Sequence, residues 1–225
     1  MAAETLAALL LLADGRLPAG GHAHSGGLEP TVAAGGVHDI ASLEEFLRGR
    51  ATTSGAVAAA FAAAACAALT AGDTGRFAVL DAELDARTPS PALRATSRKL
   101  GRQLQRAMRA IRPHPCWAEL GSRPHHPVVL GAAAAVSGLS PSAAALAAVH
   151  DAVAGPATAA VRLLGLDPFA THAVLARLGP LLDDVAADAT RRAAGSPADL
   201  PASAAPLLDL AAERHATWEV RLFAS

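Results

Sequence analysis

The chain has 225 residues, a length that fits one large domain or two small ones and can bury a core without metal or disulfide support. Hydrophobic residues make up 52% of the sequence and charged residues 17%, which excludes an intrinsically disordered chain. The net charge of −1 provides no overall attraction for nucleic acid or anionic lipid, so we expect the chain to bind neither RNA, DNA nor a membrane.

The first residues, "MAAETLAALLLLADGRLP", predict a mature helix rather than a signal peptide, because they lack a basic region and carry Glu4 early. Cys66 and Cys116 are too few for a disulfide framework and suit a reducing compartment. We therefore expect a cytoplasmic protein.

The stretch "LPAGGHAHSGGLEP", residues 17–30, raises four alternatives: a metal site, a nucleophile, a phosphate loop or part of an interface. In a phosphate loop, a lysine must directly follow the glycine at position 26, but this sequence has Gly27 there. We therefore expect no nucleotide site. Ser25 lies in a relaxed G-x-S-x-G pattern, but that motif needs a preceding strand that the sequence does not predict. A small serine hydrolase using Ser25 is the weaker alternative, and an interface loop is favoured.

Glycines give this loop its interface character, because they permit backbone angles and close approaches that other residues do not. Glu29 and Pro30 then open a short helix, with the carboxylate near the positive end of the helix dipole. His22 and His24 are the candidate metal ligands of the loop, and histidine suits nickel, copper or zinc. A stand-alone nickel-binding protein therefore remains a second alternative.

Helix signals follow along the rest of the chain. Ser42–Glu45 reads as a capping box with Ser42 as the N-cap. No charged residue occurs between Arg50 and Asp73, but this run is mostly alanine, which predicts a buried helix rather than a membrane span. Further starts and ends are predicted at Ser90-Pro91, Ser140-Pro141 and Asp167-Pro168, and at Gly35, Gly72 and Gly155.

These signals predict an all-α fold: a single-domain helical bundle of about eight to ten helices over residues 1–225. Within it, residues 195–206 have the composition of a flexible linker. The basic helix over residues 91–112 has two interpretations. We favour pairing with Asp81, Glu83 and Asp85 of the preceding helix, and the alternative is an acidic protein partner, since aromatic residues for base stacking are absent nearby.

The stretch "LPAGGHAHSGGLEP" resembles the N-terminal signature of the urease accessory protein UreF family, which reads roughly LP-V-GGF-S-Y-S-x-GLE. The positions that match are Pro18, Gly20, Gly21, Ser25, Gly27, Leu28 and Glu29, whereas His22 and His24 replace aromatic residues. The segment "HHPVVLGAAAAVSGL" resembles the family's H-x-P-V-x-x-G segment. Residues 81–107 are similar to its acidic-then-arginine helix pair.

Two further segments resemble the family with departures. In "TAAVRLLGLDP", the letters "GLDP" replace the proline, glycine and glutamine of an A-x-R-L-x-P-L-G-Q motif. The end, "AERHATWEVRLFAS", is similar to an H-E-x-Q-x-x-RLFRS tail. Arg221, Leu222, Phe223 and Ser225 match, and Ala224 replaces an arginine.

The resemblance implies an all-helical, non-catalytic chaperone that dimerises, binds UreD (also called UreH) and the GTPase UreG, and helps deliver nickel to apo-urease. It implies no tightly bound cofactor, with nickel handled transiently. The tail over residues 217–225 would dock on a partner and become ordered only on binding. The residues expected to contact partners are Pro18, Gly20, Gly21, Ser25, Gly27, Glu29, Arg221, Leu222 and Phe223.

Overall fold

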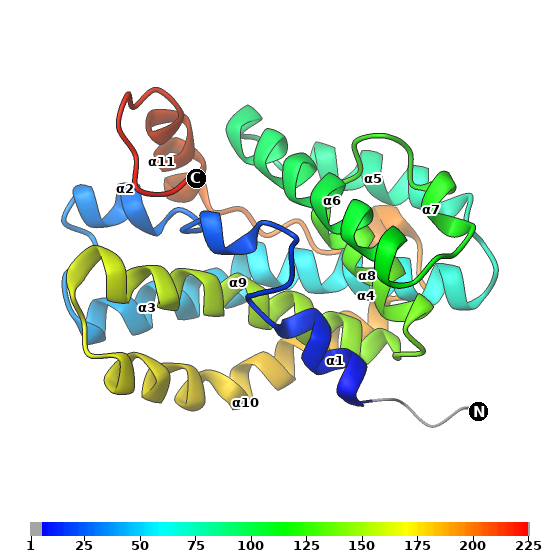
Figure 1. Cartoon of the computed structure of the whole chain (residues 1–225), viewed down its shortest axis with the longest axis horizontal. Coiled ribbons are helices and arrows are strands. Elements are labelled where there is room, and N and C mark those ends of the chain that lie inside the picture. The colour runs from blue at the N-terminus through cyan, green and yellow to red at the C-terminus, as the bar shows by residue number, and fades with distance from the viewer. Residues whose placement is uncertain (1–5, 225) are drawn as a thin grey trace.

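The computed structural model describes residues 6–224, and these residues form helices and loops with no strand, which confirms the all-α class (Figure 1). The α-helices are α1 (Leu6–Ala13), α2 (Leu28–Ala33), α3 (Ile40–Arg50), α4 (Ala56–Thr70), α5 (Arg76–Ala86), α6 (Pro91–Ile111), α7 (Cys116–Glu119), α8 (His126–Val136), α9 (Pro141–Leu164), α10 (Pro168–Arg192) and α11 (Pro206–Ala216). Short 3-10 turns, η1 (Gly21–Ala23) and η3 (Pro197–Asp199), lie in two connections, and a π-helical turn, η2 (Ala51–Gly55), joins α3 to α4.

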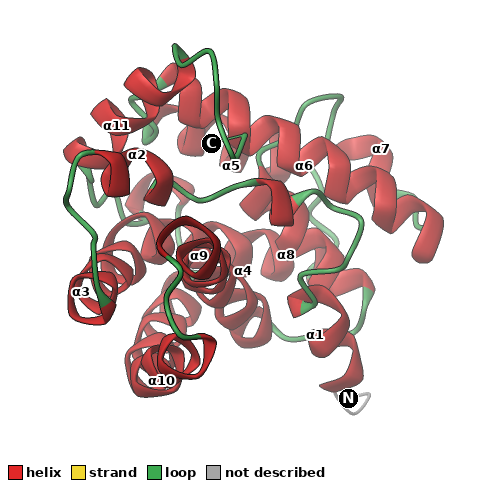
Figure 2. Ribbon diagram, turned by 60° about the vertical axis from the view of Figure 1, so that its left-hand side comes forward, coloured by secondary structure: helices red, strands yellow, loops and turns green. Residues whose placement is uncertain are grey.

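The alanine-rich helix α4 lies at the centre of the fold and packs against α8, α9 and α10 (Figure 2). Phe61 and the residues that flank it have no exposed surface, so the prediction of a buried helix is confirmed. Small side chains let these helices approach closely. A Cβ built on Gly131 of α8 would lie only 2.1 Å from the Ala62 carbonyl oxygen of α4.

Two helical stretches, Ile40–Thr70 and Pro141–Leu164, are long and apolar enough to cross a membrane by length and composition. In this structure 61% and 56% of their most apolar windows are buried among other helices. Because the core helices of a folded domain pass the same test, these stretches are only weak indications of a membrane span.

The predicted helix starts at Ser90, Ser140 and Asp167 are confirmed, since each side chain caps its helix and a proline follows. The prediction of Ser42 as an N-cap is wrong. Helix α3 begins at Ile40 and is capped by Asp39, whose carboxylate accepts a hydrogen bond from the Ser42 N–H at 2.8 Å. The Ser42 hydroxyl accepts in return from the Asp39 N–H at 3.1 Å, so Ser42 completes the box from the third helical position.

Gly35 and Gly72 follow α2 and α4 with positive φ, as expected for helix ends. The predicted end at Gly155 is wrong, because α9 continues through Gly155 and Pro156 to Leu164. Proline has no N–H for the carbonyl four residues earlier, which here belongs to Ala152. The Arg50 side chain donates its Nε hydrogen to that carbonyl at 2.9 Å and replaces the missing helical bond.

The segment predicted to be a flexible linker, residues 195–206, lies along α5 and contains η3. The guanidinium of Arg87 donates to the carbonyls of Ala198 and Leu200 at 2.8 and 3.2 Å. Leu200 is buried in the core. These contacts hold the segment between α10 and α11 against the bundle.

Candidate partner-binding site

The glycine-rich segment from Leu17 to Gly27 forms a loop that leads into α2. Gly20, Gly26 and Gly27 have φ values of 83°, 60° and 87°, in the left-handed region that favours glycine. A Cβ built on Gly20 would also lie 2.1 Å from Oε1 of Gln103 on α6. The positive φ is what favours glycine at position 20, since the end of the flexible Gln103 side chain could move away from an added Cβ.

Arg50, at the end of α3, anchors the second half of the loop. One Nη of its guanidinium donates to the Gly26 carbonyl, while Nε donates to Ala152 of α9. Burial lowers the pKa of Arg50 to about 10, and the carboxylate of Asp151 opposes that shift. The side chain is still a cation at neutral pH, so a half-buried, charge-assisted bridge joins the loop to α9.

Glu29, in the first turn of α2, is the residue that joins the loop to the C-terminal end of the chain. Its Oε1 accepts from the Leu222 N–H at 2.8 Å, and its Oε2 accepts from the Phe223 N–H at 3.0 Å. Nε2 of His215, on α11, lies 3.0 Å from the same Oε2 and donates to it, because an ionised carboxylate only accepts hydrogen bonds. Glu29 and His215 are both buried, which strengthens these interactions.

The residues after α11 turn back and run beside α2 (Figure 1). The Ala224 N–H donates to the Ala23 carbonyl at 2.7 Å. Phe223 is 5% exposed and packs in the core, with the guanidinium carbon of Arg162 at 5.2 Å from its ring centroid. Residues 17–30 and 217–224 thus form one continuous region, which we call the loop–tail surface.

The comparisons with known proteins bear on this surface. The UreF family model matches residues 37–179. A "Urease accessory protein UreF" from Mycobacterium sp. (strain JLS) is 49% identical over 221 residues, covering 98% of this chain and 99% of the relative. Proteins of the same name from Mycolicibacterium vanbaalenii and Mycobacterium tuberculosis (strain H37Rv) are 47% and 46% identical, with 99% and 94% of this chain and 100% and 94% of each relative covered.

This chain belongs to the UreF family. The family model begins after the loop and ends before the tail, but the relatives from strain JLS and M. vanbaalenii align over nearly the whole chain. Membership of this family supports a role in urease maturation.

The structure divides the expected partner-contact residues of this UreF-family chain into two groups. Ser25, Gly27, Glu29 and Phe223 are buried within the chain, whereas Pro18, Gly21, Arg221 and Leu222 are exposed and Gly20 is half-buried. The tail was expected to become ordered only on binding, but here Glu29 already holds it. In this conformation Phe223 fills a pocket of its own chain rather than one of a partner. Partner contact by the exposed residues stays a prediction.

Ser25 does not have the surroundings of a nucleophile. Its side chain has no exposed surface, and its Oγ accepts a hydrogen bond from the Glu29 N–H at 3.2 Å. A substrate carbonyl would have to reach this oxygen, and the fold covers it. The structure gives the hydrolase alternative no support and assigns Ser25 to the start of α2.

The two loop histidines of this UreF-family chain have different surroundings. His22 is exposed, whereas His24 is buried, and burial together with the charge of Lys99 lowers the pKa of His24 to about 4. Within the described residues, no group of three or more histidine, cysteine, aspartate or glutamate side chains could hold a metal ion. Nickel binding by His22 and His24 stays a prediction that requires ligands from elsewhere.

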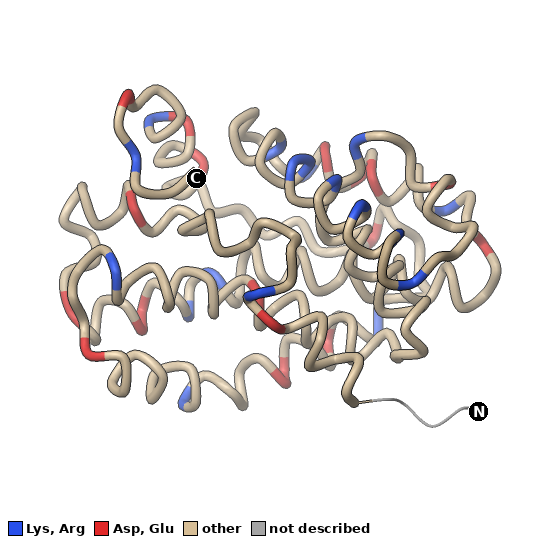
Figure 3. The backbone as a smooth tube through the Cα atoms, viewed as in Figure 1, with Lys and Arg blue, Asp and Glu red and all other residues tan. Residues whose placement is uncertain are grey.

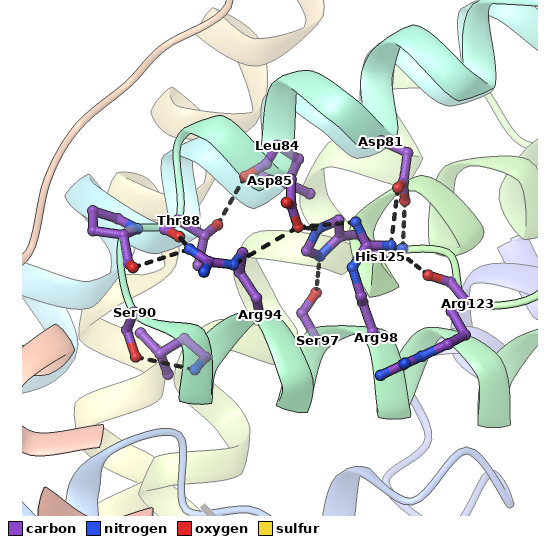
Figure 4. A network of polar contacts seen from close by, with 12 residues as sticks. Asp81, Leu84, Asp85, Thr88, Ser90, Arg94, Ser97, Arg98, Arg123 and His125 are labelled. Carbon is purple, nitrogen blue, oxygen red and sulfur yellow. Dashed lines mark hydrogen bonds and ion pairs between the residues drawn. The ribbon is translucent and has the colours of Figure 1, made fainter. Parts of the chain in front are cut away.

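Sequence reasoning missed a network around the buried side chain of His125, which joins α5, α6 and the start of α8 (Figure 4). Nδ1 of His125 lies 2.9 Å from Oγ of Ser97, and Nε2 lies 3.0 Å from Oδ1 of Asp85. Burial lowers the pKa of His125, and hydrogen bonds from Arg98 and His125 lower the pKa of Asp85 against the opposing effect of its own burial. The order of groups resembles a catalytic triad, but His125 has no exposed surface, so the network braces the fold.

The favoured interpretation of the basic helix is confirmed for two arginines, Arg94 and Arg98, and changed for one acid. Arg98 of α6 pairs with Asp81 at 3.0 Å and with Asp85 at 2.9 Å, as the sequence predicted. Glu83 pairs instead with Arg87, the residue that directly follows α5. The network in Figure 4 therefore uses the acids that face α6.

Proposed function

We propose that this UreF-family chain is a non-catalytic adaptor of urease maturation, which binds UreD (UreH) and the GTPase UreG and assists nickel insertion into apo-urease. It acts in the cytoplasm, as a homodimer. The observation that carries this proposal is the placement of the family signature and the C-terminal tail in one surface, joined by Glu29.

The construction of that surface suits a docking function. Arg50 and Glu29 hold its backbone through hydrogen bonds. The side chains of Val220 and Leu222 are 88% and 55% exposed. Exposed aliphatic side chains on a fixed backbone can enter partner pockets with little loss of conformational entropy. Such an adaptor acts by binding one state of a partner more tightly than another, and needs no catalytic group.

The direct test is the affinity of purified UreD for the chain and for the double variant Val220→Asp/Leu222→Asp. We expect the double variant to bind UreD at least about tenfold more weakly, because two apolar contacts are replaced by charges that must be desolvated. Both side chains are exposed in the isolated chain, so helicity and thermal stability should not change.

The control is Val79→Asp, which makes one such substitution at a 49% exposed valine on α5, outside the loop–tail surface. This variant should bind UreD as the unmodified chain does. Equal affinity for the double variant and the control would contradict docking through the tail.

A further inference from the structure

Helix α6 presents a second surface that the loop–tail surface does not include. From Pro91 to Arg112 the sequence contains seven arginine or lysine residues and no acid, although the whole chain carries a net charge of −1. Figure 3 shows the resulting succession of basic positions along α6. Positive charge is therefore concentrated on one helix.

The basic residues of α6 divide into two sets. Arg94 and Arg98 face α5 and meet its carboxylates. The other set is Lys99, Arg102, Arg106, Arg109 and Arg112. Within the described residues, none of these five forms an ion pair with an acidic side chain. Of these, Arg109 donates to the Trp117 carbonyl at 2.7 Å.

The first four of the unpaired residues recur at spacings of three and four, so they follow one face of the helix. All are exposed, while Gly101, Leu104, Gln105 and Met108 on the other side are buried. We call Lys99, Arg102, Arg106 and Arg109 the basic strip. Like charges in a row repel one another, so the strip costs stability in the isolated chain and gains from a partner that neutralises it.

The basic strip is continuous with the loop–tail surface. Gly20 of the loop packs on the Gln103 side chain of the same helix, and the charge of Lys99 reaches His24. A partner that covers the exposed part of the loop therefore lies beside the first residues of the strip.

We infer that the basic strip of α6 is a docking site for an acidic protein surface within the urease maturation assembly. A row of carboxylates on a partner helix repeats at the same spacing and would pair with the strip one to one. The aromatic side chains that stack bases in RNA-binding proteins are missing from the exposed face of α6, so a protein fits better than RNA. This inference rests on the proposed function.

The sequence offers a specific probe, because Lys99 is its only lysine. A carbodiimide joins an amine directly to a carboxylate, so any cross-link from a side-chain amine of this chain begins at Lys99. The experiment treats the full chain with purified UreD, UreG and apo-urease, and identifies the linked peptides by mass spectrometry. We expect Lys99 joined to an aspartate or glutamate of one of these proteins.

The functional arm uses Arg102→Glu/Arg106→Glu and the control Arg191→Glu/Arg192→Glu, which reverses two exposed charges at the end of α10. The first variant should bind the protein that the Lys99 cross-link identifies about tenfold more weakly at low salt. Its affinity for that protein should also depend much less on salt concentration. The control should keep both the affinity and the salt dependence.

Four results would overturn the inference. Lys99 could form no cross-link and keep a freely reactive amine while the assembly forms. That result would exclude the basic strip as a docking site and leave the proposed function intact. Cross-links could join Lys99 only to a second copy of the chain. The chain could bind poly(U) RNA more tightly than the purified proteins, with the affinity lost on reversing Arg102 and Arg106. Failure to bind UreD, UreG and apo-urease at all would refute the proposed function and this inference together.

Discussion

At the scale of single residues, the buried histidines show how the fold sets protonation. His24 is 8% exposed, and its pKa is lowered to about 4, first by burial and then by the nearby charge of Lys99. Burial also lowers the pKa of His125 and of His126. All three imidazoles are neutral at pH 7, because burial disfavours their charged form.

The lowered pKa of His24 predicts acid sensitivity. Because the folded pKa lies below the unfolded value of about 6.5, the unfolded chain takes up the proton first, and stability is lost as pH falls from about 6.5 toward about 4. We expect His24 alone to remove about 2 kcal/mol between pH 7 and pH 5. Urea unfolding at several pH values should therefore show a shallower loss of stability in His24→Asn than in the unmodified chain.

The control for this comparison is His38→Asn, at an exposed histidine beside Asp39. It should keep the pH dependence of the unmodified chain. A His24→Asn variant whose stability falls with pH as steeply as that of the control would contradict the role of His24.

The glycine-rich loop could be recognised from its sequence motif, but the role of Glu29 could not be predicted from the sequence. Its donors lie in His215, Leu222 and Phe223, which are 186 to 194 residues away in the sequence. Local patterns report helix starts and loop glycines, whereas a bond across such a distance depends on the whole fold. Sequence reasoning therefore found both halves of the loop–tail surface and named Glu29, but it did not predict that the Glu29 carboxylate joins them.

At the scale of elements, close helix packing decides where glycine is required. A Cβ on Gly131 of α8 would lie 2.1 Å from the Ala62 carbonyl oxygen and 2.8 Å from the Ala65 Cβ. Backbone atoms of α4 cannot rotate away as a flexible side chain can, so the two helices would have to separate. The close contact between α4 and α8 therefore requires glycine at position 131, since the methyl group of alanine would not fit.

Gly131→Ala should consequently destabilise the chain by about 2 kcal/mol or more, measured by urea unfolding, because it overpacks the α4–α8 contact. Gly179→Ala in α10 is the matched control, since nothing lies within 4 Å of its added Cβ. There alanine should leave stability unchanged or raise it by up to about 1 kcal/mol through helix propensity. Equal effects of the two substitutions would show that the contact is looser than described.

Element boundaries show where sequence signals were sufficient and where they were not. Proline after a capping residue marked the starts of α6, α9 and α10, because both preferences act within a few residues. Gly155 was wrongly predicted as an end, because the carbonyl that Pro156 leaves without a helical donor is satisfied by Arg50 from another helix. A tertiary hydrogen bond overrode a correct local preference.

At the scale of the whole molecule, a buried alanine-rich core supports two exposed regions of different character. The loop–tail surface presents aliphatic side chains on a fixed backbone, and the basic strip presents exposed cations on an adjoining helix. Together with membership of the UreF family, these regions indicate a protein that works through its partners. The all-α class was predictable from composition and capping, whereas the adjacency of the two regions follows only from the fold.

The most direct measurement is urease activity after incubating purified apo-urease, UreD, UreG, GTP and nickel with or without this chain. Addition of the chain should raise the activity well above the background without it, and Val220→Asp/Leu222→Asp should lower that gain while Val79→Asp preserves it. Activation to the same level in the absence of the chain would contradict an adaptor role in urease maturation.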